Sequence, residues 1–305
     1  MYKVLDLFSG MGGFSSGFVH AGFDVTGVDI SDQVGMAYEK FTGSKFLKID
    51  LRNEDVIGDF DVVIGGPPCR PWSAVNRSKS RGSKHRDFYL LSRFFHHVLL
   101  MRPKIFILEN VPLLRNDPEF FAQLQRAAAA GYSVAHRIFR YSDFGAATSR
   151  RRLIAVGILD GSGDDFLNDL ERIKGNPMDV RSVISDFRYA CKSCLPDHVW
   201  PNLNTVGRYR EKYYYGRFGW RILEWDEPAP SFGNVMKTYI LHPDSDLDSG
   251  EYRPVSVLEV SRIMGFNHGF SFPEGLGMSI RYQMLVDSVS PVFSSVLSQA
   301  VLKFL

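Results

Sequence analysis

Apolar and polar residues alternate along the first half of the chain in a pattern that predicts strands and helices in turn. Runs rich in β-branched and aromatic residues, typical of strands, occupy residues 3–8, 23–30, 45–51, 60–65, 104–109, 133–140 and 152–158. Segments with helical apolar spacing lie between them, ending near residue 21 and covering residues 33–41, 88–101 and 118–130. The run FDVVIG at residues 60–65 suits a strand buried on both faces. We therefore expect an α/β fold with a doubly wound, mostly parallel sheet.

This alternation of predicted strands and helices ends after about residue 161. Residues 161–250 are rich in glycine, proline, aromatic and charged residues without a clear period, which predicts a smaller, irregular domain. Helical patterns return at residues 256–264 and 291–304. We expect one domain from residues 1–175 and 280–305, a second from residues 176–255, and a hinge at residues 256–279.

Composition narrows the class of protein only moderately. The 36 Lys and Arg residues nearly balance the 34 Asp and Glu residues, so any basic surface for an acidic partner must be local. No apolar run reaches the roughly 18 residues of a membrane span, and no signal peptide is evident, so we expect a cytoplasmic protein. The 3 cysteines, an odd number, argue against a disulfide scaffold and for a reducing compartment.

Glycines follow the first predicted strand in the segment DLFSGMGGFSSGF. Gly10, Gly12 and Gly13 would let a ligand approach the backbone at the beginning of a helix. Ser15 stands where the dinucleotide fingerprint needs a third glycine, which weakens an NAD interpretation. Asp29 and Asp50 end the second and third strands and suit an adenosine ligand. The alternatives are a tight turn without a ligand and acids that merely cap helices.

A cysteine follows the fourth predicted strand in the segment GGPPCRPWS. Prolines on both sides hold Cys69 stiffly beside Arg70, which favours a reactive thiolate over a buried structural cysteine. Glu109 ends the fifth strand in a Glu-Asn-Val segment, where it would lie near Cys69, although it could also belong to a helix cap. Arg150 and Arg152 would share one face of the seventh strand and suit an anionic or carbonyl-rich ligand, or else form a solvated basic run.

These segments, in this order, resemble the DNA cytosine-5 methyltransferase family. The segments DLFSGMGG, GGPPCRPWS and ENV, residues 149–152, and RPVSVLEVSRIMGF at residues 253–266 match its motifs. The resemblance implies a Rossmann-like methyltransferase sheet, a target-recognition domain in the irregular region, and S-adenosyl-L-methionine as cofactor. It also implies that Cys69 attacks C6 of a cytosine flipped out of duplex DNA, with Glu109, Arg150 and Arg152 as the other catalytic residues.

The resemblance and the residue types together give two further sets of candidates. For the cofactor these are Phe8, Ser9, Gly10, Gly12, Gly13, Asp29, Ile30, Asp50, Leu51, Pro67, Leu90, Asp287, Ser288 and Val289. For DNA they are Arg70, Ser73, Arg77, Lys79, Arg81, Arg86, Arg208, Arg210, Arg217 and Arg221, which lie in two basic segments.

The chain departs from the family pattern in four places. Arg70 stands where Gln is usual, Trp72 where Phe is common, and Thr148 where Gln usually precedes the arginines. The last motif has Val286 and Asp287 in place of Gly and Asn, next to the predicted cofactor residues Ser288 and Val289.

Double-stranded DNA is the expected partner of a monomeric, cytoplasmic and nucleoid-associated protein, and a companion restriction endonuclease would fit this role. A tRNA cytosine methyltransferase of the same fold and a DNA-binding relative without catalysis are the alternatives. Cys191, Cys194 and His198 resemble half of a zinc site, but no second pair is evident, so we expect no metal.

Overall fold

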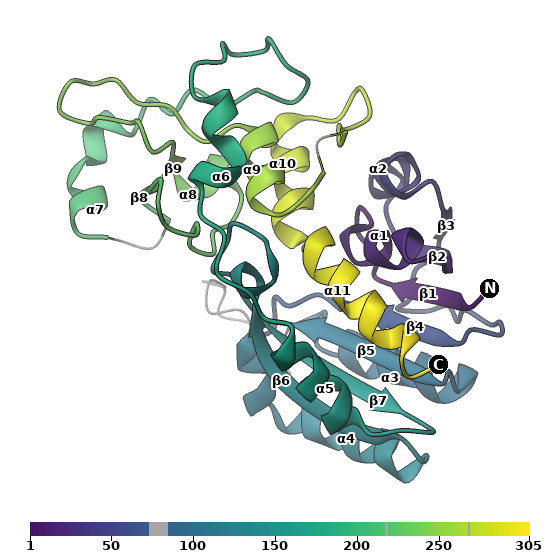
Figure 1. Cartoon of the computed structure of the whole chain (residues 1–305). Helices are drawn as coiled ribbons and strands as arrows, with labels where there is room; N and C mark the ends of the chain where they lie inside the picture. Colours follow the sequence, from purple (N-terminus) through teal and green to yellow (C-terminus); the bar gives the residue numbers. More distant parts are fainter. Residues whose placement is uncertain (73–84, 217–218, 268) are drawn as a thin grey trace. The chain divides into compact units, whose positions relative to one another are not determined.

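A seven-stranded sheet forms the centre of one of the two compact units into which the chain divides (Figure 1). The computed structural model describes residues 1–72, 85–216, 219–267 and 269–305. The first unit contains residues 1–139, 151–174 and 293–305, and the second contains residues 140–150 and 175–292.

The strand order in the sheet is β3-β2-β1-β4-β5-β7-β6. Neighbours from β3 to β5 pair in parallel, whereas β5 and β7 pair antiparallel. The strands are β1 (Lys3–Leu7), β2 (Asp24–Asp29), β3 (Lys45–Lys48), β4 (Val62–Gly65), β5 (Ile105–Asn110), β6 (Ser133–Arg140) and β7 (Arg151–Ile158). Every residue of β4 and β5 is buried, as expected for central strands covered on both faces.

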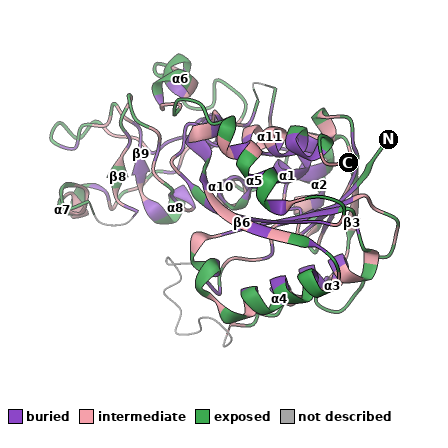
Figure 2. Ribbon diagram, turned by 60° about the horizontal axis from the view of Figure 1, so that its bottom comes forward, coloured by how far each residue is buried: buried purple, intermediate pink, exposed green. Residues whose placement is uncertain are grey.

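Helices cover both faces of this sheet. Figure 2 shows α3 and α4 on one face and α1, α2, α5 and α11 on the other. Their bounds are α1 (Gly13–His20), α2 (Asp32–Thr42), α3 (Leu90–Met101), α4 (Pro118–Ala129), α5 (Gly163–Arg172) and α11 (Pro291–Leu302). The predicted doubly wound, Rossmann-like α/β fold is confirmed.

The second unit is mostly irregular. Its elements are α6 (Arg181–Ile184), α7 (Glu211–Tyr214), β8 (Arg221–Ile222), α8 (Val235–Thr238), β9 (Ile240–Leu241), α9 (Val257–Ile263) and α10 (Met278–Asp287). All of α9 is buried, and a capping box of Ser256 and Glu259 begins it. Arg253 donates to both carboxylate oxygens of Glu259 at 2.8 and 2.7 Å. Burial would raise the pKa of Glu259, but Arg253, His242 and the Ser256 N–H together hold that pKa below its ordinary value.

Two helices, α5 and α10, lie where the sequence pattern predicts no regular structure. The α5 helix buries Phe166, Leu167 and Leu170, and the Ser162 hydroxyl accepts from the Asp165 N–H at its beginning. The expected division into domains at residues 1–175 with 280–305, 176–255 and 256–279 stays a prediction.

One helical stretch, Met278–Leu302, is long and apolar enough by length and composition to cross a membrane. However, 61% of its most apolar window is buried inside the protein, as in the core helix of a soluble protein. It consists of α10 and α11, which are separated at residues 288–290.

Candidate active site

The ends of the parallel strands bring the predicted cofactor and catalytic segments to one edge of the sheet. Strands β1, β2, β4 and β5 run in the same direction, so the residues that follow them share this edge. They are the glycine loop after β1, Asp29 at the end of β2, the Cys69 segment after β4, and Glu109 near the end of β5. All of them belong to the first unit.

The glycine loop has an unusual backbone. Phe8, Gly10 and Gly12 all have positive φ angles, of 61°, 53° and 92°, and Gly12 is the N-cap of α1. The Gly10 N–H donates to Asp29 Oδ2 at 3.2 Å. Burial raises the pKa of the Asp29 carboxyl. The loop and the second strand are therefore joined directly at the predicted cofactor site.

Two features of this loop fit the adenosine ligand that the sequence predicts. A Cβ built on Gly10 would meet nothing within 4 Å, so the backbone there borders open space. The buried Ser9 hydroxyl has no hydrogen-bond partner among the described residues. An unpartnered buried hydroxyl and open space at the next residue suit a ligand that supplies the missing partner.

Ser15, which replaces the third glycine of the dinucleotide fingerprint, has a structural role. Its hydroxyl donates to Asp6 Oδ2 at 2.7 Å and accepts from the Tyr38 hydroxyl at 2.8 Å. Burial raises the pKa of Asp6 to about 8, although the bond from Ser15 lowers it. This chain of three buried side chains supports the glycine loop from within the unit. Sequence reasoning singled out Ser15 only as a missing glycine.

The other cofactor candidates differ in exposure. Leu51 and Leu90 are buried, whereas Ile30 is 48% exposed. Arg52 donates to both carboxylate oxygens of Asp50, at 2.8 and 2.9 Å, and its bonds hold the pKa of Asp50 below its ordinary value. Asp50 therefore already has a charged partner, although its carboxylate keeps further lone pairs for an amino group.

The Cys69 segment begins directly after β4 and is fixed at its first proline. The Asn110 amide donates to the Pro67 carbonyl at 2.9 Å, and Asn110 is 1% exposed. The backbone N–H of Trp72 donates to the Cys69 carbonyl at 3.0 Å and closes a turn. Cys69 itself is half-buried. Asn110, the middle residue of the Glu-Asn-Val motif, holds this segment by a contact that sequence reasoning did not predict.

Glu109 lies close to the beginning of the Cys69 segment. A Cβ built on Gly66 would be 3.3 Å from Glu109 Oε2, so only glycine leaves this carboxylate full room. Arg152 Nε is 2.7 Å from Glu109 Oε1, and the two side chains are 11% and 10% exposed. The antiparallel register of β5 and β7 brings the beginning of β7 beside the end of β5, which makes this ion pair possible.

The remaining catalytic and cofactor candidates belong to the second unit. Arg150 donates from Nη1 to the carbonyl of Val286, the first residue of the last predicted motif. Asp287 accepts from the Gln283 amide at 2.8 Å, and the Ser288 hydroxyl donates to the Val289 carbonyl at 3.0 Å. Their roles toward a base or a cofactor stay predictions.

The basic candidates for DNA binding are only partly described. Ser73, Arg77, Lys79, Arg81 and Arg217 lie outside the described residues. Arg70, Arg86, Arg208 and Arg221 are exposed. Arg210, which is half-buried, donates to Asp248 at 2.8 Å.

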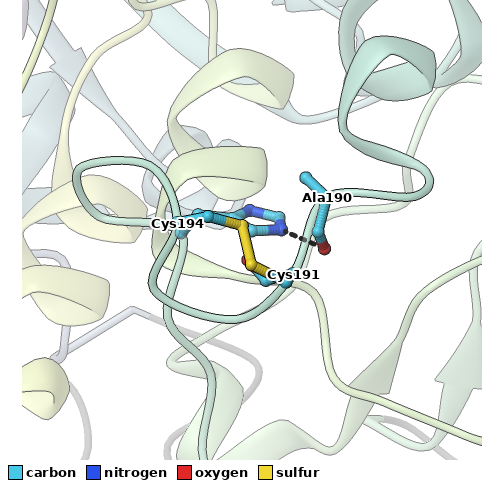
Figure 3. The surroundings of a disulfide bond; sticks show 4 residues. Ala190, Cys191 and Cys194 are labelled. Atoms are coloured by element: carbon cyan, nitrogen blue, oxygen red, sulfur yellow. Dashed lines mark hydrogen bonds between the residues drawn. A yellow bond between two sulfur atoms is a disulfide. The ribbon is translucent and has the colours of Figure 1, made fainter.

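The two cysteines of the half zinc site bond to each other. A disulfide joins Cys191 and Cys194, three residues apart, and closes a local loop (Figure 3). The neighbouring His198 ring contacts the Ser256 hydroxyl at 3.0 Å and the Ala190 carbonyl at 3.3 Å. Within the described parts of the chain, no group of three or more His, Cys, Asp or Glu residues is placed to hold a metal.

Comparisons with known proteins agree with this geometry. A family model described as C-5 cytosine-specific DNA methylase matches residues 2–302. The Type II methyltransferase M.HindV of Haemophilus influenzae is 27% identical, over 99% of this chain and 97% of its own length. M.FnuDI of Fusobacterium nucleatum is also 27% identical, over 88% of this chain and 86% of its own.

Solved structures show the same fold at low identity. Entamoeba histolytica methyltransferase EhMeth superposes with a TM-score of 0.74 at 17% identity, covering 99% of this chain and 98% of its own. A DNA modification methyltransferase encoded within an Escherichia coli prophage gives a TM-score of 0.72 at 18% identity, covering 100% and 99% of the two chains.

Proposed function

Since the chain belongs to the C-5 cytosine-specific DNA methylase family and is a DNA (cytosine-5-)-methyltransferase, we propose that Cys69 is the nucleophile of the reaction. In this proposal the enzyme transfers a methyl group from S-adenosylmethionine to C5 of a cytosine flipped out of duplex DNA. The observation that carries it is the common edge of the sheet at which the glycine loop, the Cys69 segment and the Glu109–Arg152 pair meet.

The proposed chemistry uses each of these residues once. The Cys69 thiolate forms a bond to C6 of the cytosine, which makes C5 nucleophilic. Glu109 hydrogen-bonds the N3 and amino edge of the ring, and Arg152 holds the Glu109 carboxylate in place at 2.7 Å. Bound S-adenosylmethionine supplies an electrophilic methyl group. Loss of the C5 proton and breakage of the bond between Cys69 and C6 then restore the aromatic ring.

The cofactor residues of the first unit would hold the adenosine part of this donor. The Ser9 hydroxyl and the open space beside Gly10 lie in the glycine loop, and Asp29 is tied to that loop by the Gly10 N–H. A carboxylate at the end of the second strand suits ribose hydroxyls. We assign Asp50 to the adenine amino group, and Asp287, Ser288 and Val289 to the methionine end.

Duplex DNA is the proposed substrate, as the family description indicates. The target cytosine would have to be flipped out, because Cys69 cannot reach a base that is stacked inside the duplex. The irregular region at residues 176–255 would read the target sequence, with Arg208, Arg210 and Arg221 near the phosphates. We further propose a cytoplasmic, nucleoid-associated monomer. Since the M.HindV and M.FnuDI relatives carry the name Type II methyltransferase, a companion restriction endonuclease fits this role.

Replacement of Cys69 tests the assignment of the nucleophile. We expect Cys69→Ser to abolish methyl transfer while duplex binding survives, because only the attacking sulfur is lost. A duplex with 5-fluorocytosine at the target should form a stable covalent adduct with the wild-type enzyme, since fluorine cannot leave as a proton does. Full activity of Cys69→Ser, or turnover without any adduct, would refute the proposal.

Bisulfite sequencing of host DNA after expression would identify the methylated cytosines and the recognition sequence together. Methyl incorporation into tRNA but not into DNA would overturn the choice of substrate. Tight DNA binding without methyl transfer by the wild-type chain would show a relative that has lost catalysis.

A further inference from the structure

Trp72, on the C-terminal side of Cys69, bonds the Cys69 segment to a different part of the first unit. Its indole Nε1–H donates to Asp117 Oδ2 at 2.7 Å, across 45 positions of sequence. The ring is 7% exposed and packs against Phe88, with ring centroids 5.6 Å apart. The other oxygen of Asp117 accepts the Glu119 N–H at 2.9 Å and caps α4. One carboxylate therefore ties a helix and the Cys69 segment together.

The near end of the same segment is fastened by the Asn110 amide on the Pro67 carbonyl, at 2.9 Å. Cys69 lies between these two attachments, and the turn from the Trp72 N–H to the Cys69 carbonyl links it to the indole side. A hydrogen bond to a charged acceptor is stronger than one between neutral groups.

We propose that Trp72 and Asp117 are positioning residues that hold the Cys69 sulfur in the position needed for attack on C6 of the pyrimidine ring. This inference rests on the proposed function. Neither side chain would touch substrate or cofactor. The indole–carboxylate bond keeps the segment from relaxing, and small misplacements of a reacting atom are costly in rate. The bond acts on the step that joins sulfur to C6, and leaves cofactor and DNA affinity unchanged.

Two matched substitutions remove this bond from either side. Trp72→Phe keeps an aromatic ring against Phe88 but has no N–H donor. Asp117→Asn keeps one oxygen to cap α4 through the Glu119 N–H, while its amide group cannot accept from the indole. We expect each variant to slow adduct formation with a 5-fluorocytosine duplex about tenfold, which corresponds to about 1.4 kcal/mol. The double variant should be no slower than either single one, because both remove the same bond.

Tyr132→Phe is the matched control for general loss of stability. The buried Tyr132 hydroxyl donates to the Pro103 carbonyl at 2.7 Å, just before β5 begins and so at the end of that strand opposite Glu109. This control should lose stability without losing the rate of adduct formation. Unchanged adduct rates in Trp72→Phe and Asp117→Asn, or additive losses in the double variant, would overturn the proposal. So would rate losses matched by Tyr132→Phe.

Alkylation of Cys69 by iodoacetamide, followed by peptide mass spectrometry, gives a readout that needs no methyl transfer. A loosened segment exposes the half-buried thiol, so we expect Trp72→Phe and Asp117→Asn to react several times faster than wild type and Tyr132→Phe to react like wild type. Equal alkylation rates in all four proteins would overturn the positioning role. Absence of any adduct in the wild type, with altered alkylation in the two variants, would instead refute the proposed function alone.

Discussion

Gly10 and Gly12 allow the glycine loop to be tested for stability and for binding separately. Both have positive φ angles, of 53° and 92°, so an alanine at either position costs about 1–2 kcal/mol through its backbone alone. Their surroundings differ. A Cβ on Gly10 meets nothing within 4 Å, whereas a Cβ on Gly12 would lie 2.5 Å from Thr42 Cγ2 and 3.0 Å from the Tyr38 ring.

The two substitutions should therefore have opposite profiles. Overpacking in a core costs about 1–3 kcal/mol, so Gly12→Ala should lower the free energy of unfolding by about 2–5 kcal/mol in total. Gly10→Ala should lower it by only about 1–2 kcal/mol. The new methyl group of Gly10→Ala would instead occupy the space proposed for the cofactor, and we expect its affinity for S-adenosylmethionine to fall about tenfold or more.

Urea unfolding followed by circular dichroism gives the free energies, and calorimetric titration of S-adenosylmethionine into the folded variants gives the affinities. Equal unfolding free energies for the two variants would refute the role assigned to Thr42 and Tyr38. Wild-type cofactor affinity in Gly10→Ala would show that the cofactor does not lie against this part of the loop.

Three further substitutions address other parts of the molecule. Glu109→Gln should reduce turnover by about 10²–10⁴-fold with unchanged cofactor affinity, because a hydrogen-bonding acid is lost beside Arg152; a variant with wild-type turnover in a radioactive methyl-transfer assay would contradict this. Burial lowers the pKa of His242 from 6.5 to about 4. As the pH falls from about 6.5 to about 4, the unfolded chain therefore takes up a proton at this histidine before the folded chain does. The free energy of unfolding should drop by about 3 kcal/mol over this pH range. His242→Asn should abolish this component in urea unfolding measured at both ends of the range, and an unchanged pH dependence would exclude His242 as its source. Ser15→Ala should lower the free energy of unfolding by about 1–3 kcal/mol, because Asp6 and Tyr38 would each lose a buried hydrogen bond. An unchanged midpoint of thermal unfolding would contradict the role given to these three side chains.

The sequence predicts the site best where chemistry follows from strand ends. The glycine loop follows β1, the Cys69 segment follows β4, and the Glu-Asn-Val segment lies at the end of β5. Parallel strands bring these ends to one edge of the sheet. The meeting of the glycine loop, Cys69 and Glu109 could therefore be predicted from order alone.

Pairings that depend on strand direction or on distant side chains could not be predicted. The period of two in β7 is the same for a parallel and an antiparallel strand, so nothing in the sequence shows that Arg152 pairs with Glu109. The bond from Trp72 to Asp117 leaves no periodic trace across 45 positions. The α10 helix follows Gly277 without a side-chain cap, which explains why the sequence gives no beginning for it. The α5 helix does begin at a capping serine, Ser162, and our interpretation of the sequence missed that signal.

The reversed direction of β7 has a consequence for protein engineering. Arg152 lies one residue beyond the pair formed by Asn110 and Leu153, so strand alignment, and not the length of the preceding connection, sets its distance to Glu109. Chimeric enzymes that exchange residues 141–150 for connections of other lengths should keep the ion pair as long as that alignment is preserved. A slip of one position would turn the arginine to the opposite face and leave the carboxylate without its partner.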